Sequence, residues 1–329
     1  MPTLPVLLSS PVTLPFSRVI ITTAFQCSVS QHANYSKGGK ESTNSFVAIS
    51  NVIEAALEKS NVVPKDAIQL VTTRDAIASL LAQDRYIDLV VPRGSNELVR
   101  YIKESTKIPV LGHADGLCHI YLTASADPQK AITAIVDSKT SYPAACNSTE
   151  SLLVQESALS TIFPAVAKAL SDKGVELRVD GPSKAAIADL NLPKVVDVSP
   201  KDYDTEHLSL TISVKTVAST EEAIKHINTH GSGHTDCIMT SDKQEAEHFM
   251  NTVDAAGVYW NASTRLADGM RYGFGTEVGI STNKIHSRGP VGLEGLTIYK
   301  YKIRGDYQPT AQYGDGEGQK PWKHEKQSI

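Results

Sequence analysis

Apolar and polar positions along this chain alternate between two spacings. From residue 44 to 59 the apolar side chains recur every three or four positions, as on one face of a helix, and an apolar run at 68–72 then predicts a short buried strand. Such alternation of helices and strands indicates an α/β fold with parallel strands joined by right-handed crossovers. The same pattern predicts further helices at 75–82 and 96–104 and further strands at 87–92 and 108–111.

A second α/β unit is predicted from residue 117 onward. Residues 208–214 alternate between apolar side chains and Ser or Thr, as a half-buried strand does. Ser219 and Glu222 form a capping-box pattern that predicts the start of a helix running to Ile227. The other predicted elements are strands at 117–123, 152–154, 236–240 and 258–263 and helices at 128–136 and 159–170.

Composition and charge narrow the class of protein. The chain has 32 basic and 36 acidic residues in 329, so its net charge of -4 offers no large basic field to a nucleic-acid backbone. No run approaches the roughly 20 uninterrupted apolar residues that a membrane-spanning helix needs. The four cysteines are widely spaced and form no C-x-x-C pair, which argues against a disulfide framework and a structural zinc site. We therefore expect a soluble cytoplasmic protein with no nucleic-acid or membrane partner.

The turn at 92–96 is one candidate site, because it joins a predicted strand to a predicted helix. Gly94 allows backbone angles that other residues avoid, and the helix amides beyond Ser95 would face an anion such as a pyrophosphate. Ligands of open parallel sheets sit at the carboxyl ends of the strands, where this turn lies. A cap at Ser95 and a simple turn at Gly94 explain the same residues, and the two common glycine-rich nucleotide signatures are absent.

Cys146 is the best candidate for a nucleophile. It lies in an irregular loop between a predicted helix and a predicted strand, with small neighbours at Ala144 and Ala145 that leave the sulfur open. A small buried hydrophobic role is the alternative for any lone cysteine, and Cys118 and Cys237 fit that role because they lie in apolar strand patterns.

Histidines and arginines supply weaker candidates. His226, His230 and His234 are spaced by four, but the glycines at 231 and 233 end that helix, so we expect surface or capping roles and no metal site. Seven glycines lie within residues 269–295, and three arginines lie in or just before this stretch, a pattern that suits close backbone approaches around an anion or a neighbouring subunit. Structural turns explain this pattern almost as well. The three arginines are Arg265, Arg271 and Arg288.

Several longer stretches, in the same order, resemble one family, the gamma-glutamyl phosphate reductases of the aldehyde dehydrogenase superfamily. They span residues 37 to about 303. The stretches are Lys37-Gly-Gly-Lys-Glu41, Val91-Pro-Arg-Gly-Ser-Asn96, Ile108-Pro-Val-Leu-Gly-His-Ala-Asp-Gly116, Asp137-Ser-Lys with Tyr142-Pro-Ala-Ala-Cys-Asn147, Gly233-His-Thr-Asp236, Ala267-Asp-Gly with Gly275-Thr-Glu-Val-Gly-Ile-Ser-Thr282, and Arg288-Gly-Pro-Val-Gly-Leu-Glu-Gly295.

The resemblance implies an aldehyde-dehydrogenase-like fold and NADPH-dependent reduction of gamma-glutamyl phosphate to glutamate 5-semialdehyde and phosphate, in proline biosynthesis. It implies that Cys146 is the nucleophile that forms a thioester, that Gly94 and Ser95 lie under the cofactor phosphates, and that Lys37 lies beside the nucleotide. Asn147 and Arg271 are our candidates for substrate contacts. Hydrolytic relatives use a glutamate to activate water, and the matching stretch 111–116 has none.

Residues 1–36 depart from the family pattern, which has a longer segment there. They contain no Asp or Glu and show no sustained periodicity. The chain therefore resembles an N-terminally truncated member, and the alternative to the family activity is a catalytically silent fragment that at most joins oligomers of intact relatives. A third hypothesis keeps the chemistry and changes the acyl phosphate.

From these patterns we expect five regions and a homo-oligomer. The regions are an atypical N-terminal segment (1–36), a partial dinucleotide-binding domain (37–123), a catalytic domain (124–280), an oligomerisation segment (281–303) and a disordered tail (304–329).

Overall fold

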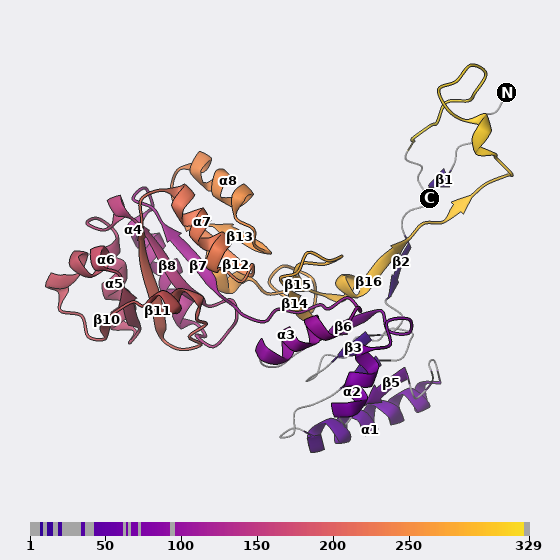
Figure 1. Cartoon of the computed structure of the whole chain (residues 1–329), viewed down its shortest axis with the longest axis horizontal. Coiled ribbons are helices and arrows are strands. Elements are labelled where there is room, and N and C mark those ends of the chain that lie inside the picture. The colour runs from indigo at the N-terminus through magenta and orange to yellow at the C-terminus, as the bar shows by residue number, and fades with distance from the viewer. Residues whose placement is uncertain are drawn as a thin grey trace.

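A seven-stranded parallel sheet forms the larger body of the protein. The computed structural model describes residues 7–8, 12–15, 19–21, 34–36, 43–61, 64, 67–71, 74–92 and 96–325. Figure 1 shows the large sheet with its helices, a smaller body around β6, and a C-terminal arm that runs away from both. The strand order is β10-β9-β11-β8-β7-β12-β13, with every neighbouring pair parallel. The strands are β7 (Cys118–Leu122), β8 (Thr149–Gln155), β9 (Glu176–Val179), β10 (Val195–Asp197), β11 (Thr211–Val217), β12 (Thr235–Met239) and β13 (Gly257–Trp260).

Alternation along the central strands explains why this sheet is covered on both faces. In β7, Ile120 and Leu122 join one apolar cluster, whereas Tyr121 joins the other. Successive side chains of a strand point to opposite faces, so an apolar run with no polar break needs helices on both sides. The first cluster includes residues of α4 (Pro128–Thr140) and α5 (Phe163–Asp172), with α6 (Gly181–Ala186) beside them in Figure 1, and the second includes residues of α7 (Thr220–His230) and α8 (Lys243–Thr252).

Several predicted boundaries shift in the structure. The strand predicted at 208–214 is β11, which begins at Thr211 and continues to Val217. The helix predicted at 159–170 begins only at Phe163, because a 3-10 turn at Glu156–Ala158 precedes it. The strand predicted at 108–111 is reduced to one bridge, between Val90 and Val110.

The predicted cap of α7 is confirmed in part. The Ser219 side chain accepts a hydrogen bond from the Glu222 amide, while the Glu222 carboxylate accepts from the Ala218 amide, one residue before the usual partner. The helix ends at His230, and Gly231 follows it as predicted.

A four-stranded parallel sheet forms the smaller body, in the order β5-β4-β3-β6. Two of its strands, β3 (Val19–Ile21) and β4 (Asn34–Ser36), precede residue 37, and the other two, β5 (Ile68–Leu70) and β6 (Leu89–Val91), follow it. Residues 1–36, which show no sustained periodicity, therefore contribute two strands to this sheet, and the region of predicted α/β alternation contributes the other two. Three helices accompany this sheet, α1 (Thr43–Ser60), α2 (Arg74–Leu81) and α3 (Asn96–Ser105).

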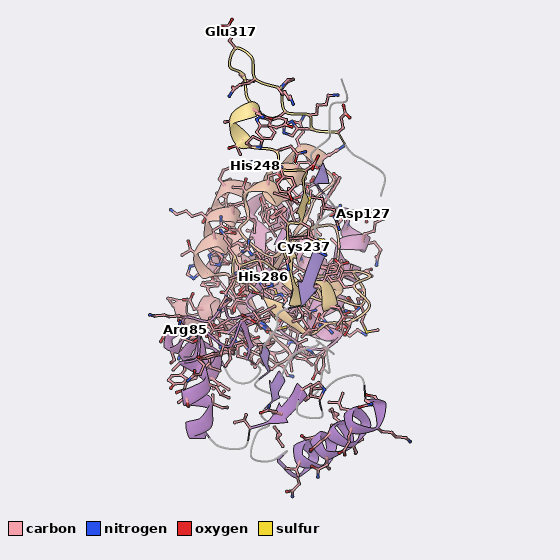
Figure 2. All side chains as sticks on the ribbon, turned by 90° about the vertical axis from the view of Figure 1, so that its right-hand side faces the viewer. Arg85, Asp127, Cys237, His248, His286 and Glu317 are labelled. Atoms are coloured by element: carbon pink, nitrogen blue, oxygen red, sulfur yellow. The ribbon has the colours of Figure 1, made fainter. Side chains whose placement is uncertain are left out.

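The remaining strands build the connection to the arm. β14 (Gly279–Ser281) pairs with β15 (Gly289–Val291), β16 (Thr297–Lys300) with β2 (Val12–Pro15), and β17 (Ile303–Arg304) with β1 (Leu7–Leu8), each antiparallel. Figure 2 shows Glu317 at the far end of the arm and Cys237 in the dense middle of the molecule. Within the described residues no helix combines the length and apolar character needed to cross a membrane. The other 3-10 helices are Ala188–Leu190, Pro200–Asp204, Thr264–Leu266, Leu293–Leu296 and Thr310–Gln312.

A cluster of buried histidines lies between α7 and the sheet. The ring of His226 packs edge-on against His119 and Tyr203, with centroids 5.7 Å and 5.2 Å away. Burial, reinforced by His119, His230 and Lys215, lowers the pKa of His226 from 6.5 to about 3. This side chain is therefore neutral in the folded protein at neutral pH, whereas in the unfolded chain it gains a proton below about pH 6.5.

We expect the protein to lose stability as the pH falls from about 6.5 toward 3, because the unfolded state then binds protons that the folded state does not. His226 contributes up to about 1.4 kcal/mol per pH unit in this window. Urea unfolding at several pH values should show a shallower dependence for His226→Gln than for the native sequence. Equal slopes for the two proteins would contradict this assignment.

Candidate functional site

Cys146 stands in the loop that joins α4 to β8. Two turns shape this loop, since the Ala145 amide donates to the Tyr142 carbonyl at 3.1 Å and the Ser148 amide to the Ala145 carbonyl at 2.8 Å. Cys146 is partly buried, whereas Cys118 and Cys237 are fully buried in the sheet, and burial raises the pKa of both buried thiols. The Cys118 thiol also donates to the Cys146 carbonyl at 3.3 Å, which holds the loop against the first strand of the large sheet.

Gly116 brings a second backbone segment against the same loop. A Cβ added at Gly116 would lie 2.5 Å from the Cα and 2.6 Å from the carbonyl carbon of Cys146. Real Cβ atoms do not approach backbone so closely, so glycine is required here by space. The Glu206 carboxylate accepts a hydrogen bond from the Gly116 amide, and burial raises the pKa of this carboxyl.

A buried ion pair closes the two ends of the cysteine loop. The Lys139 ammonium, in the last turn of α4, lies 2.9 Å from the Glu150 carboxylate in β8, and both side chains are at most 1% exposed. Burial raises the pKa of Glu150 to about 7, although the Lys139 charge opposes the shift. Desolvation is costly for both groups, so removing one partner would leave the other unpaired in the interior.

Asn147 is anchored to the segment that contains Thr264 and Ala267. Its side-chain amide donates to the Ala267 carbonyl at 2.9 Å, and its backbone carbonyl accepts from the Thr264 hydroxyl at 2.7 Å. The side-chain oxygen is buried and has no hydrogen-bond partner in the part of the chain that the structure describes. The predicted substrate contact thus lies next to Cys146 with one unused acceptor.

Arg271 is exposed, and its guanidinium donates to the carbonyl of Arg265. Arg265 is the arginine that touches the cysteine loop, because its guanidinium lies over the Tyr142 ring, 5.9 Å from the centroid. Arg288 instead pairs with Asp254 at 2.9 Å. From the sequence we chose Arg271 as the candidate for a substrate contact, whereas the fold places Arg265 against the cysteine loop.

Two histidines that sequence reasoning did not connect with Cys146 lie beside it. One ring nitrogen of His113, one of His234 and the Cys146 sulfur all lie within 4.8 Å of one another. The two rings pack edge-on with centroids 5.2 Å apart, and the Nδ1 of His113 is 3.4 Å from the Ile280 carbonyl. Burial, reinforced by His113, lowers the pKa of His234 to about 3, so this imidazole is neutral at neutral pH.

The site forms at the amino ends of three adjacent strands. His113 precedes β7, Cys146 precedes β8 and His234 precedes β12, and these strands are neighbours in the order β8-β7-β12. This cluster therefore lies at the edge of the large sheet opposite to the carboxyl ends of its strands. The signal available in the sequence was that each of the three residues lies within six positions before a predicted strand.

The carboxyl edge of the smaller sheet contacts the segment that carries His113. Strand β6 ends at Val91, and a Cβ added at Gly112 would lie 2.9 Å from the Pro92 side chain, so the two segments are in contact. The Asn96 side chain at the start of α3 donates to Asp115, in the segment that carries His113. Lys37, Gly94 and Ser95, the predicted cofactor contacts, lie outside the described residues.

The aldehyde dehydrogenase family model matches residues 35–188 and 194–286 of this chain. The chain belongs to the aldehyde dehydrogenase family. Within it, similarity is high to gamma-glutamyl phosphate reductases, so the predicted resemblance and the predicted fold class are confirmed.

Three relatives illustrate this similarity. A probable gamma-glutamyl phosphate reductase of Schizosaccharomyces pombe is 55% identical over 292 residues, covering 88% of this chain and 64% of that protein. The gamma-glutamyl phosphate reductase of Saccharomyces cerevisiae is 50% identical, covering 89% of this chain and 67% of that protein. The crystal structure of the Thermotoga maritima enzyme is 34% identical with a TM-score of 0.84, covering 91% of this chain and 74% of that one. The chain thus spans about two thirds of the length of the curated relatives it matches.

We expect Lys139→Met to lower the free energy of unfolding by about 3–5 kcal/mol, because it leaves the Glu150 carboxyl buried without its partner. Chemical denaturation measures this change. The matched control is Lys168→Met, which removes an exposed pair with Asp172 and should cost less than about 1 kcal/mol.

A second substitution separates the ion pair from simple packing. Lys139→Met combined with Glu150→Leu should recover part of the lost stability, since no unpaired charge remains. If the double variant is as unstable as the sum of the two single variants, the pair does not act as described.

Proposed function

We propose that this chain carries out the reduction of gamma-glutamyl phosphate to glutamate 5-semialdehyde, with Cys146 as the nucleophile. The observation that carries the proposal is the position of the Cys146 thiol, which lies where the carboxyl edge of the smaller sheet meets the amino edge of the larger one. The similarity to gamma-glutamyl phosphate reductases names the substrate class. A partly buried thiol beside the neutral imidazole of His234 suits an acyl transfer that avoids water.

The proposed chemistry begins with attack of the Cys146 thiolate on the acyl carbon of gamma-glutamyl phosphate. The carbon–sulfur bond forms as the carbon–oxygen bond to phosphate breaks, and inorganic phosphate leaves with the electron pair. The resulting thioester carbonyl accepts a hydride more readily than an ester would. Collapse of the tetrahedral intermediate expels the thiolate and releases the aldehyde, which regenerates Cys146 for the next turnover.

The residues around the thiol have distinct proposed roles. The backbone contacts of Gly116 and Cys118 hold the Cys146 loop in place, so the sulfur needs little rearrangement to reach the substrate. Asn147 is a proposed substrate contact, and because its buried, unpartnered side-chain oxygen is an acceptor, it suits a hydrogen-bond donor of the substrate. Arg271 remains the proposed contact for an anionic group of the substrate.

The cofactor proposed for this reaction is NADP. Strand β6 ends at Val91 and helix α3 begins at Asn96, so the chain passes from the carboxyl end of a parallel strand to a helix N-terminus within a few residues. Anionic groups of dinucleotides bind between such a strand and helix, which supports the proposal that Gly94 and Ser95 bind the phosphates and that Lys37 binds beside the nucleotide. When bound, NADPH supplies the hydride for the thioester.

The segment before β7 favours hydride transfer over hydrolysis. Gly112 and His113 stand in the stretch where hydrolytic relatives carry a water-activating glutamate. The pathway proposed is proline biosynthesis in the cytoplasm, and the exposed tyrosines of the arm, Tyr299 and Tyr301, suit a homo-oligomer contact.

The test is phosphate-dependent reduction of NADP by glutamate 5-semialdehyde, measured on the purified folded chain. Cys146→Ala should lose more than about a thousandfold in kcat, because no other group replaces the nucleophile. The control is Cys237→Ala, whose thiol is buried in the sheet and donates to the Ala262 carbonyl. Turnover that survives Cys146→Ala would remove the nucleophile assignment.

Thermal unfolding with and without NADPH provides a readout besides activity. A ligand bound by the folded state raises the midpoint, by an amount that grows with its concentration over Kd. A folded chain with neither a shift nor turnover would support the alternative of a catalytically silent fragment. Turnover that is faster with an acyl phosphate of another chain length would change the substrate and leave the chemistry in place.

A further inference from the structure

The donor atoms around Cys146 have the composition of a transition-metal site. His113, Cys146 and His234 form the one group of three such side chains, among the residues that the structure describes, whose ligand atoms lie within 4.8 Å of one another. A thiolate with two imidazoles is a ligand set that favours Zn²⁺ and similar ions over Mg²⁺ or Ca²⁺, which prefer oxygen.

His234 provides an independent indication that a ligand belongs here. Its side chain is only 1% exposed, and its Nδ1 lies 2.9 Å from the Thr235 hydroxyl. The other nitrogen, Nε2, is buried and has no hydrogen-bond partner in the described part of the chain. A buried polar atom without a partner costs free energy, so such an atom in a folded protein calls for an explanation.

The fold presents the three side chains on rigid supports. Each stands just before a strand of the central β8-β7-β12 ribbon, and the Gly116 contact fixes the Cys146 loop against the segment that carries His113. The backbone of His234 is held as well, because its carbonyl accepts from the Gly257 amide at 3.0 Å. Metal sites bind well when their ligands are positioned in advance by such elements.

We infer that His113, Cys146 and His234 bind a thiophilic divalent cation of the Zn²⁺ class, with three protein ligands and a fourth position open to water or another oxygen ligand. Binding replaces the thiol proton with the metal, so one proton is released for each ion bound. The sulfur electron pair that would attack a substrate is then engaged in the metal–sulfur bond. Metal binding and acylation of Cys146 therefore exclude each other, a consequence that rests on the proposed function.

Binding is tested with Co²⁺ on the full chain, because a thiolate bound to cobalt produces a charge-transfer absorption band in the near ultraviolet. We expect one Co²⁺ per chain, displaced by Zn²⁺. The band should vanish in Cys146→Ser, and the affinity should fall at least tenfold in His113→Gln and in His234→Gln. No band, or a band of full strength in Cys146→Ser, overturns the inference.

The matched control is His226→Gln, because His226, like His119 and His234, is a buried histidine whose Nε2 has no partner among the described residues. It lies in α7, and its substitution should leave the cobalt band and the affinity unchanged. A loss in His226→Gln equal to that in His234→Gln would show that the effect comes from stability and would overturn the assignment of the ligands.

Alkylation of Cys146 gives a second measurement that needs no histidine variant. Iodoacetamide labelling, mapped by mass spectrometry of peptides, should be slowed at least tenfold at Cys146 by one equivalent of Zn²⁺ and unchanged by Mg²⁺. Equal labelling rates with and without Zn²⁺ overturn the inference even if a histidine variant fails to fold.

The two proposals fail in different ways. If the cobalt band appears but the metal-free chain shows no turnover, the metal site stands and the proposed function falls. If turnover is present and neither the band nor Zn²⁺ protection of Cys146 is found, the metal site falls alone. When both stand, Zn²⁺ should inhibit turnover in proportion to the fraction of chains bound in the cobalt competition.

Discussion

The approach of Gly116 to Cys146 is the constraint on which the site depends. No side chain fits between these two backbone segments, because a Cβ on Gly116 would meet the Cα and carbonyl carbon of Cys146. The contact fixes the loop before β8 against the segment before β7, and the Cys118 thiol strengthens it by donating to the Cys146 carbonyl. A reactive sulfur needs a defined position, and here packing of main chain against main chain provides it.

Around this contact the protein buries charged and polar groups in specific pairs. Lys139 and Glu150, at the two ends of the cysteine loop, form an ion pair that is buried away from water. Such a pair contributes little net stability compared with apolar residues of the same volume, but it penalises any arrangement that separates its members. The pair therefore favours the loop conformation in which α4 and β8 lie side by side.

The two sheets meet at opposite edges, which decides where a substrate and a dinucleotide can come together. Pro92 follows β6 at the carboxyl edge of the smaller sheet, and its contact with Gly112 joins this edge to the amino edge of the larger sheet. A single rule about strand ends cannot predict such a site, because it describes one sheet at a time. The neutral state of His234 follows from the same burial, since the surrounding apolar and main-chain atoms cannot solvate a charge.

Local sequence patterns determined the features that depend on neighbouring residues. They include the α/β alternation, the Ser219 cap, the end of α7 before Gly231 and the loop that carries Cys146, each of which arises from propensity or periodicity within a few positions. The motifs that resemble the family also lie in such short stretches. Tertiary structure alone decided that His113 and His234 meet Cys146, that Arg265 rather than Arg271 touches its loop, and that strands before residue 37 enter the smaller sheet. These pairings join segments far apart in the chain, and the order of strands in a sheet, which no local pattern encodes, sets which of them become neighbours.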